Sequence, residues 1–357
     1  MQNAEIKNNM PRRISRLVHA GPVPIGGGAR VSVQSMLSRP AHDIAANIVQ
    51  ALALEQAGCD IIRAAVPDLE AVKLIAALKE HCTAPIVADI HFDYRLALES
   101  LAAGADKIRI NPGNIGGRDR VKAVADACLA KSVPIRIGVN SGSLEKDLLA
   151  KYGAPTPEAM AESAMNHARL LEACDFRDIV ISLKSSDVAN TVRAYEILAG
   201  QCDYPLHVGV TEAGTVHMGV VKSSIGIGAL LLRGIGDTIR VSLTADPVEE
   251  VRAARDILRA LGQGSGPDII SCPTCGRTKI DLIALVNEAE RRLMGCGKRV
   301  TVAIMGCAVN GPGEAREADI GLAGGDGCAL LFRKGEILRK VPEARAIDEL
   351  MEEIEKL

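Results

Sequence analysis

Short apolar runs recur along the first 250 residues of the chain and alternate with longer amphipathic stretches. Eight of these runs are rich in Val and Ile, at 31–36, 60–66, 85–90, 107–110, 134–139, 178–183, 206–210 and 238–243. The stretches between them, such as 45–58, 69–81 and 118–131, have the pattern of helices. Mostly unbroken apolar strands alternating with helices indicate a parallel sheet covered by helices. Eight such units in about 250 residues predict a (β/α)8 barrel of the TIM type. An open doubly wound sheet is the alternative, but no GxGxxG follows the first strand.

Two further segments define the domain organisation. Residues 18–29, VHAGPVPIGGGA, predict a hairpin that plugs the barrel floor, and residues 247–261 predict the closing helix. The Gly-rich linker GQGSGP then places the boundary between a barrel domain, 1–262, and a second domain, 263–357. The second domain is predicted to be a small α+β domain, with strands at 268–271, 299–305 and 328–332 and helices at 279–293 and 343–357.

Composition narrows the function class. The chain is 48% hydrophobic but has only three Phe, four Tyr and no Trp, so its core is aliphatic. A net charge of −2 and so few aromatic residues argue against binding of duplex or single-stranded nucleic acid. No apolar run is long enough to span a bilayer, and the first ten residues lack the apolar stretch of a signal peptide. We therefore expect a cytoplasmic protein.

Three of the ten cysteines have the spacing of metal ligands. In a reducing compartment disulfides are not expected, and the other seven cysteines lack ligand spacing. Cys272 and Cys275 form a CxxC just after a predicted strand, and Cys307 follows the next strand in a Gly/Pro-rich turn. Two loops at the ends of neighbouring strands can converge on one site, and their glycines admit close backbone approach.

Three kinds of site compete for these thiols. Structural zinc requires four nitrogen or sulfur ligands, and no second CxxC or HxxxH completes the set. A thioredoxin-like dithiol would leave Cys307 without a role. An iron–sulfur cluster held by three thiolates and one exceptional ligand agrees best with the pattern, and the nearest candidate for the fourth ligand is Glu314, seven residues after Cys307. A carboxylate is a harder and more exchangeable iron ligand than a thiolate.

Charged residues gather where the predicted barrel strands end. Active sites of these barrels lie at the carboxyl ends of the strands. Those ends carry Gln34, Ser35, Arg63, Asp89, His91, Arg109, Asn111, Arg136, Asn140, Lys184, Ser185, Thr211, Glu212 and Ser242. Each cation could serve a local ion pair, but four on four strands outnumber Asp89 and Glu212 and predict a polyanionic ligand such as a diphosphate. The Gly-rich segment 222–228 is expected to add backbone N–H groups for phosphate.

With these residues in view, the chain closely resembles the family of 4-hydroxy-3-methylbut-2-enyl diphosphate synthases of the methylerythritol phosphate route to isoprenoids. The resemblance runs from about Arg12 to the end of the chain. The motifs that carry it are RRISRLVHAGPVPIGG, VSVQSM, ADIHFDYRLAL, KIRINPGNIG, RIGVNSGSLE, ISLKSS, GVTEAG, GIGDTIRVSLT, CPTCGR and GCAVNGPGEA. The second domain also resembles the cluster modules of sulfite and nitrite reductases. The extra middle domain of three-domain members is absent.

The resemblance implies an activity and a set of site residues. The reaction is the two-electron reductive ring opening of 2-C-methyl-D-erythritol 2,4-cyclodiphosphate, with loss of water, to 4-hydroxy-3-methylbut-2-enyl diphosphate. A 4Fe–4S cluster on Cys272, Cys275, Cys307 and Glu314 would deliver electrons from flavodoxin or ferredoxin. Arg63, Arg109, Arg136 and Lys184 would bind the diphosphate, with Ser271 beside the cluster, and Asp89, Asn140 and Glu212 would contact the substrate or move protons.

An assembly and a competing function class follow. The predicted linker is too short for a cluster domain to reach its own barrel mouth, so we expect a homodimer in which each cluster domain closes the partner's barrel. The family resemblance implies the same head-to-tail arrangement. The alternative to this enzyme is a redox-inert phosphate-binding barrel, a lyase or synthase, with a structural zinc domain.

Overall fold

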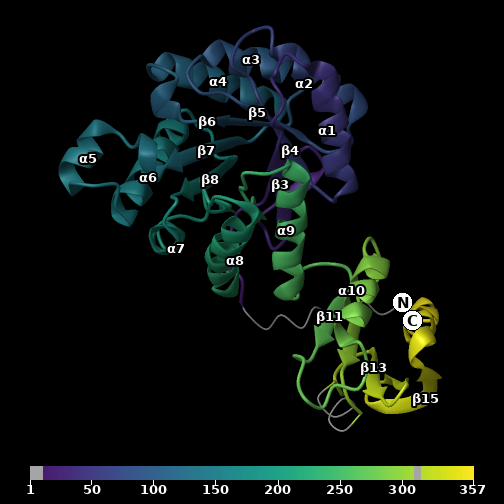
Figure 1. Ribbon diagram of the computed structural model, residues 1–357. Helices are drawn as coiled ribbons and strands as arrows, with labels where there is room; N and C mark the ends of the chain where they lie inside the picture. The colour runs from purple at the N-terminus through teal and green to yellow at the C-terminus, as the bar shows by residue number, and fades with distance from the viewer. Residues whose placement is uncertain (1–10, 309–314) are drawn as a thin grey trace. The chain divides into compact units, whose positions relative to one another are not determined.

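The computed structural model describes residues 11–308 and 315–357, and the chain divides into two compact units, residues 1–263 and 264–357 (Figure 1). Each unit has a sheet and a hydrophobic core of its own. No helix in the described ranges has the length and apolar character needed to cross a membrane.

The first unit is a parallel eight-stranded barrel. Its strands follow the order β8-β7-β6-β5-β4-β3-β10-β9, and a bridge between Ile181 and Leu206 joins the two ends of that order. All eight predicted strands form, which confirms the (β/α)8 barrel. Their bounds are β3 (Ser32–Met36), β4 (Ile61–Ala65), β5 (Ile86–Asp89), β6 (Lys107–Ile110), β7 (Ile135–Asn140), β8 (Ile179–Lys184), β9 (His207–Val208) and β10 (Thr238–Ile239).

Helices surround these strands (Figure 1). They are α1 (Ile44–Gln56), α2 (Val72–His81), α3 (Tyr94–Ala102), α4 (Arg118–Lys131), α6 (Pro157–Glu172), α7 (Val188–Ala199), α8 (Val216–Leu232) and α9 (Pro247–Ala260), with a short extra helix, α5 (Lys146–Tyr152), before α6. Side-chain caps mark several helix starts: Asp43, Asp93, Asp187 and Asp246 each accept a bond from a backbone N–H one turn on.

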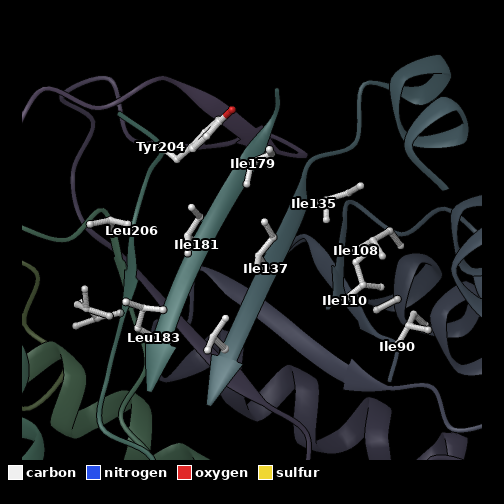
Figure 2. Packing of buried hydrophobic residues seen from close by; sticks show 14 of the residues in the cluster. Ile90, Ile108, Ile110, Ile135, Ile137, Ile179, Ile181, Leu183, Tyr204 and Leu206 are labelled. Atoms are coloured by element: carbon white, nitrogen blue, oxygen red, sulfur yellow. The ribbon is translucent and has the colours of Figure 1, made fainter. Parts of the chain in front are cut away.

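Alternation along the strands separates an apolar outer surface from a polar interior. Ile179, Ile181 and Leu183 of β8 belong to the core between the strands and the helices, as the close view of that core shows (Figure 2). Because successive side chains of a strand point to opposite faces, Ser182 and Lys184 point into the barrel. The strands therefore deliver polar and charged groups to the interior while their other face holds the fold together.

A hairpin closes one end of this interior. Strands β1 (Val18–Ala20) and β2 (Val23–Ile25) pair around a Gly21-Pro22 turn, as predicted. Val18, Ala20 and Ile25 form a separate buried cluster with Ile61, Val87 and Val180 at the amino ends of the strands. The barrel floor is thus apolar and closed.

The Gly-rich segment 222–228 lies inside helix α8, so the expected phosphate loop is wrong. Backbone N–H groups in a helix interior bond to carbonyls of the same helix and cannot receive a phosphate. Two glycines of this helix instead permit close packing. A Cβ at Gly219 would meet Leu243 Cδ2 at 2.5 Å, and one at Gly226 would meet Val210 Cγ2 at 2.7 Å.

In the residues that the structure describes, the second unit is a five-stranded sheet with two helices on one face. Strand order is β11-β12-β13-β14-β15, parallel from β11 to β13 and antiparallel thereafter. The elements are β11 (Asp268–Ser271), α10 (Leu282–Leu293), β12 (Thr301–Met305), β13 (Ile320–Gly325), β14 (Cys328–Arg333), β15 (Glu336–Pro342) and α12 (Ala346–Glu355). Strands β13 and β15 were not predicted, because IGLAGG has the composition of a loop and EILRKVP is a mostly exposed, charged edge strand.

Gly321 of β13 lies where no larger residue can pack. A Cβ there would overlap the Phe332 ring and the Ala303 carbonyl oxygen. We predict that Gly321→Ala lowers the free energy of unfolding by about 1–3 kcal/mol through overpacking, measured by thermal or denaturant unfolding of the whole chain. Gly297→Ala is the matched control, since a Cβ there meets nothing within 4 Å. Equal effects of the two substitutions would contradict this explanation.

Candidate functional site

A buried double ion pair lies at the carboxyl ends of β4, β5 and β6. Arg63 Nη2 donates to Asp89 Oδ2 at 2.6 Å, and Arg109 Nη1 donates to Asp89 Oδ1 at 3.1 Å. Arg109 also donates to the Gly138 carbonyl at 3.2 Å. Asp89 is fully buried, and both arginines are almost so. One carboxylate therefore orients two guanidinium groups from neighbouring strands.

Asp89 stays ionised because of its neighbours. Burial by itself raises the pKa of this carboxyl, but the charges of Arg63, Arg109 and His91 lower the pKa to about 2. His91 Nε2 lies 3.8 Å from Asp89 Oδ2. A group that holds its negative charge so firmly is suited to positioning cations rather than to donating protons near neutral pH.

Arg136 and Lys184 form a second group of cations without a carboxylate. Arg136 donates to Ser182 Oγ from Nη2 at 2.8 Å and from Nε at 3.2 Å. Within the described ranges neither cation makes an ion pair. Burial lowers the pKa of both side chains. The positive charges of Arg63 and Arg109 lower the pKa of Arg136 further. The charges of Arg136 and Arg240 do the same for Lys184.

Two inward-facing glycines allow close packing in the barrel interior. A Cβ on Gly138 would lie 2.7 Å from Arg109 Nε, whereas one on Gly209 would first meet the Arg240 carbonyl oxygen at 2.3 Å and then Lys184 Nζ at 3.1 Å. The barrel interior is therefore shaped to hold cations close together, at an electrostatic cost that an anionic ligand would remove.

Polar groups from the loops border this interior. Asn111 Oδ1 accepts from the Gly138 N–H at 3.1 Å, and the Thr211 N–H donates to the Ser185 carbonyl at 3.2 Å. Asn140 ends β7 half-buried. Glu212 is exposed and has a φ of +50°, a left-handed conformation uncommon for a residue other than glycine. Strained residues of this kind cluster at functional sites.

Four residues that point into the barrel were not predicted from the sequence: Lys107, Ser182, His207 and Arg240. Arg240 lies 3.4 Å from Glu250, which also accepts from Ser35 Oγ at 3.1 Å and from the Leu243 N–H at 3.0 Å. The alternation of side chains along a strand could have identified these four residues. Each lies two positions from a residue predicted at the barrel mouth or from an inward-facing glycine, and therefore on the same face of its strand.

In the second unit, the loops bearing the three candidate cysteine ligands leave adjacent parallel strands. Ser271 of β11 pairs in register with Ile304 of β12, so Cys272 and the 306–307 loop lie at the same sheet edge. The Gly306 N–H donates to Cys272 Sγ at 3.2 Å, and the Gly306 carbonyl accepts from the Lys279 N–H at 2.9 Å. Ser271 and Cys275 are exposed, whereas Cys272 and Cys307 are half-buried.

The donor chemistry of this edge suits an iron–sulfur cluster. A backbone N–H already points at one sulfur, as in the hydrogen bonding that supports cluster sulfur atoms. The Arg277 N–H, followed by the Arg277 and Thr278 side chains, lowers the pKa of Cys275, which favours the thiolate form that ligates metal. In the described part of the chain no three Cys, His, Asp or Glu side chains are close enough together to hold a metal ion. The thiols share an edge, and Glu314 lies outside the described residues.

Comparisons with known proteins agree over nearly the whole chain. Residues 15–255 match the family model described as the GcpE TIM-barrel domain, and residues 268–356 match the GcpE protein C-terminal domain. This chain belongs to the GcpE family.

Curated relatives of this GcpE chain are similar over their full length. A protein of Clostridium perfringens is 55% identical, covering 98% of this chain and 100% of the relative. One of Geobacter sulfurreducens is 56% identical, covering 96% and 98%. Both are named 4-hydroxy-3-methylbut-2-en-1-yl diphosphate synthase (flavodoxin). Among solved structures, dihydropteroate synthase from Stenotrophomonas maltophilia has a TM-score of 0.49 at 17% identity, covering 69% of this chain and 97% of that chain.

The Asp89 ion pairs predict a specific pH dependence of stability for this GcpE chain. The folded-state pKa of about 2 lies below the ordinary value of 3.8, so the stabilisation is present above pH 4 and is lost as pH falls through about 2. The shift corresponds to roughly 2 kcal/mol. Denaturant unfolding of wild type and Asp89→Asn between pH 5 and pH 2 measures this contribution. We expect the stability difference between them to shrink by that amount on acidification. A difference that stays constant would show that Asp89 does not carry the linkage.

Proposed function

We propose that this GcpE family member is an iron–sulfur 4-hydroxy-3-methylbut-2-enyl diphosphate synthase that acts in isoprenoid biosynthesis. It takes 2-C-methyl-D-erythritol 2,4-cyclodiphosphate, opens the ring with two electrons and two protons, and releases one water. The names of the full-length relatives support this assignment. The structural observation that carries it is the pair Arg136 and Lys184, buried in a closed barrel without an acidic partner in the described ranges.

The barrel residues bind and orient the substrate. Arg63 and Arg109, fixed by Asp89, present their guanidinium groups from one side of the interior. Arg136 presents its guanidinium from β7, and Lys184 presents its ammonium from β8. Guanidinium groups match the paired oxygens of a diphosphate, and burial removes competing water. Asn140 then lies at the mouth within the same set of strand ends, where it contacts the carbon portion of the substrate.

Glu212 is the better proton donor of the two candidate acids. Asp89 accepts from two arginines and has a pKa of about 2, so it acts as a positioning residue. Glu212 is exposed at the carboxyl end of the barrel in a strained backbone conformation. A carboxyl in that place can be protonated from solvent and can deliver the proton as water leaves.

The second unit holds the redox centre in this proposal. Cys272, Cys275 and Cys307 would ligate a 4Fe–4S cluster, with Glu314 as the fourth ligand and Ser271 beside it. When bound, such a cluster supplies the two electrons singly. The names of the relatives support flavodoxin as the electron donor. The lowered pKa of Cys275 and the N–H of Gly306 at Cys272 Sγ support the ligand assignment.

Chain length supports a homodimer with sites completed in trans. Helix α9 starts beside the mouth, where Glu250 contacts Ser35, and continues to the floor, where Arg255 lies 2.9 Å from Asp60 just before β4. The linker from α9 to β11, residues 261–267, has seven residues and spans at most about 25 Å, and the 14 residues of α9 alone rise about 21 Å. A fully extended linker would be almost used up in running back along α9, before it crosses the barrel rim. A cluster unit therefore reaches a partner's barrel mouth more readily than its own.

The first prediction of this proposal concerns metal and turnover together. Anaerobically prepared protein should contain about four iron and four sulfide per chain and convert the cyclic diphosphate with reduced flavodoxin. Cys272→Ser, Cys275→Ser and Cys307→Ser should each lose iron and turnover. Cys328→Ser, in β14 of the same unit, should keep both. Stoichiometric zinc without sulfide, in protein never exposed to air, would overturn the redox assignment.

The second prediction concerns the site in trans. Cys307→Ser and Arg136→Ala should each be inactive alone, but mixing them with subunit exchange creates one site with an intact barrel and intact cluster ligands. Random exchange should restore up to about a quarter of wild-type activity per chain, because half the dimers each regain one of two sites. Exchange shown by mass spectrometry without recovered activity would mean that each chain completes its own site.

A further inference from the structure

A lysine is buried deep in the barrel, below the residues already described. Lys107 lies on β6 two residues before Arg109, so both side chains enter the interior. It is fully buried, and no described residue forms a hydrogen bond or ion pair with its Nζ. Lys107 pairs in register with Val87, a member of the apolar floor cluster. The backbone of Lys107 therefore lies close to the closed floor.

Other buried polar groups without described partners also line the barrel interior. His207 forms no hydrogen bond through either ring nitrogen, and Thr238 and Ser32, which adjoin it in register, form none through their hydroxyls. One nitrogen of Arg136, Nη1, is also without a partner among the described residues. Buried polar groups are rarely left unpaired in native proteins, so a group of five from five strands indicates a ligand or bound water between them.

The charges around Lys107 select an anion. The ionisable groups that face the interior are Arg63 on β4, Asp89 on β5, Arg109 on β6, Arg136 on β7, Lys184 on β8, His207 on β9, Arg240 on β10 and Glu250 on α9. Asp89 is paired with two arginines, and Glu250 with Arg240 and Ser35. No described carboxylate remains for Lys107, Arg136 or His207.

We propose that Lys107, His207 and Arg136 form an inner subsite that binds a phosphate oxyanion at the base of the barrel. This deepens the proposed function, on which it rests: the inner phosphate group of the cyclic diphosphate occupies the subsite, while Arg63, Arg109 and Lys184 hold the outer one. Ser32 and Thr238 supply hydroxyl groups that bond to the same oxyanion or to water around it.

Lys107 destabilises the folded protein when no ligand is bound. Burial, followed by the charges of Arg136 and Arg63, lowers the pKa of Lys107 to about 7. An ammonium group in such surroundings destabilises the ligand-free fold, and a ligand that neutralises it recovers that loss. A buried lysine that lowers stability is expected at a position where ligand binding requires its charge.

The test separates binding from folding. Inorganic diphosphate is titrated calorimetrically into wild type, Lys107→Met and the control Lys131→Met, whose lysine donates to the Leu101 carbonyl in the last turn of α3. We expect Lys107→Met to bind diphosphate at least tenfold more weakly and to have a higher thermal midpoint without ligand. Lys131→Met should keep wild-type affinity. Unchanged affinity in Lys107→Met would overturn the subsite.

A second measurement uses the wild-type protein alone and decides the question if the variant does not fold. Sulfate does not titrate near neutral pH, so any proton taken up on binding enters the protein. At pH 8 Lys107 is largely neutral, and an anion in the barrel raises the pKa of Lys107 and of the other buried cations such as Lys184. Sulfate binding should therefore take up protons, read with a pH indicator in weak buffer. Sulfate that neither stabilises the protein nor causes proton uptake would overturn the proposal.

The diphosphate and sulfate measurements also test the inner subsite separately from the proposed enzymatic function. Diphosphate and sulfate binding require neither cluster nor turnover, so loss of activity in the whole enzyme leaves their outcome intact. A free phosphate ion and the substrate are distinguished by competition. If the cyclic diphosphate displaces inorganic phosphate from wild type in a one-to-one ratio, the subsite belongs to the substrate, and if both bind together it does not.

Discussion

Excess positive charge inside a closed barrel is the constraint on which the rest of this structure depends. Arg63, Arg109, Arg136 and Lys184 point into an interior whose floor is sealed by the β1–β2 hairpin. Asp89 pairs with Arg63 and Arg109, and no carboxylate in the described part of the chain pairs with Arg136 or Lys184. Like charges held together in a medium of low polarity repel strongly. The fold tolerates this because the apolar outer face of every strand packs against a helix, and the ligand-free site is thereby preorganised for a polyanion.

The same constraint explains features that have no value for stability alone. Gly138 has no side chain, which leaves room for the Arg109 guanidinium. Ser182 offers Arg136 a hydroxyl rather than a carboxylate, which satisfies two of its N–H groups without neutralising its charge. Glu212 holds a left-handed backbone conformation at the mouth. These features leave the positive charge of the interior unbalanced and keep a strained residue at the mouth, and an anionic ligand would neutralise that charge.

Much of this architecture could be predicted because strand alternation and helix periodicity are local properties. All eight barrel strands, the floor hairpin and the four cations at the strand ends follow from patterns a few residues long. The failures have non-local causes. The glycines of β13 give its sequence the composition of a loop, yet Gly321 is required by Phe332 and Ala303, which lie on other strands. The glycines of segment 222–228 suggest a phosphate loop, yet Gly226 admits Val210 and Val188 against α8. The partners of Asp89 and the isolation of Lys107 depend on the register of separate strands, which no single segment specifies.

The central claim is that unbalanced cations in the barrel bind the diphosphate of the substrate. A crystal structure of the anaerobic protein with 2-C-methyl-D-erythritol 2,4-cyclodiphosphate tests it most directly. The account predicts phosphate oxygens within hydrogen-bond distance of Arg63, Arg109, Arg136 and Lys184, with Asp89 still paired to both of its arginines. A diphosphate bound outside the barrel, with Arg136 and Lys184 still lacking an anionic partner, would contradict it.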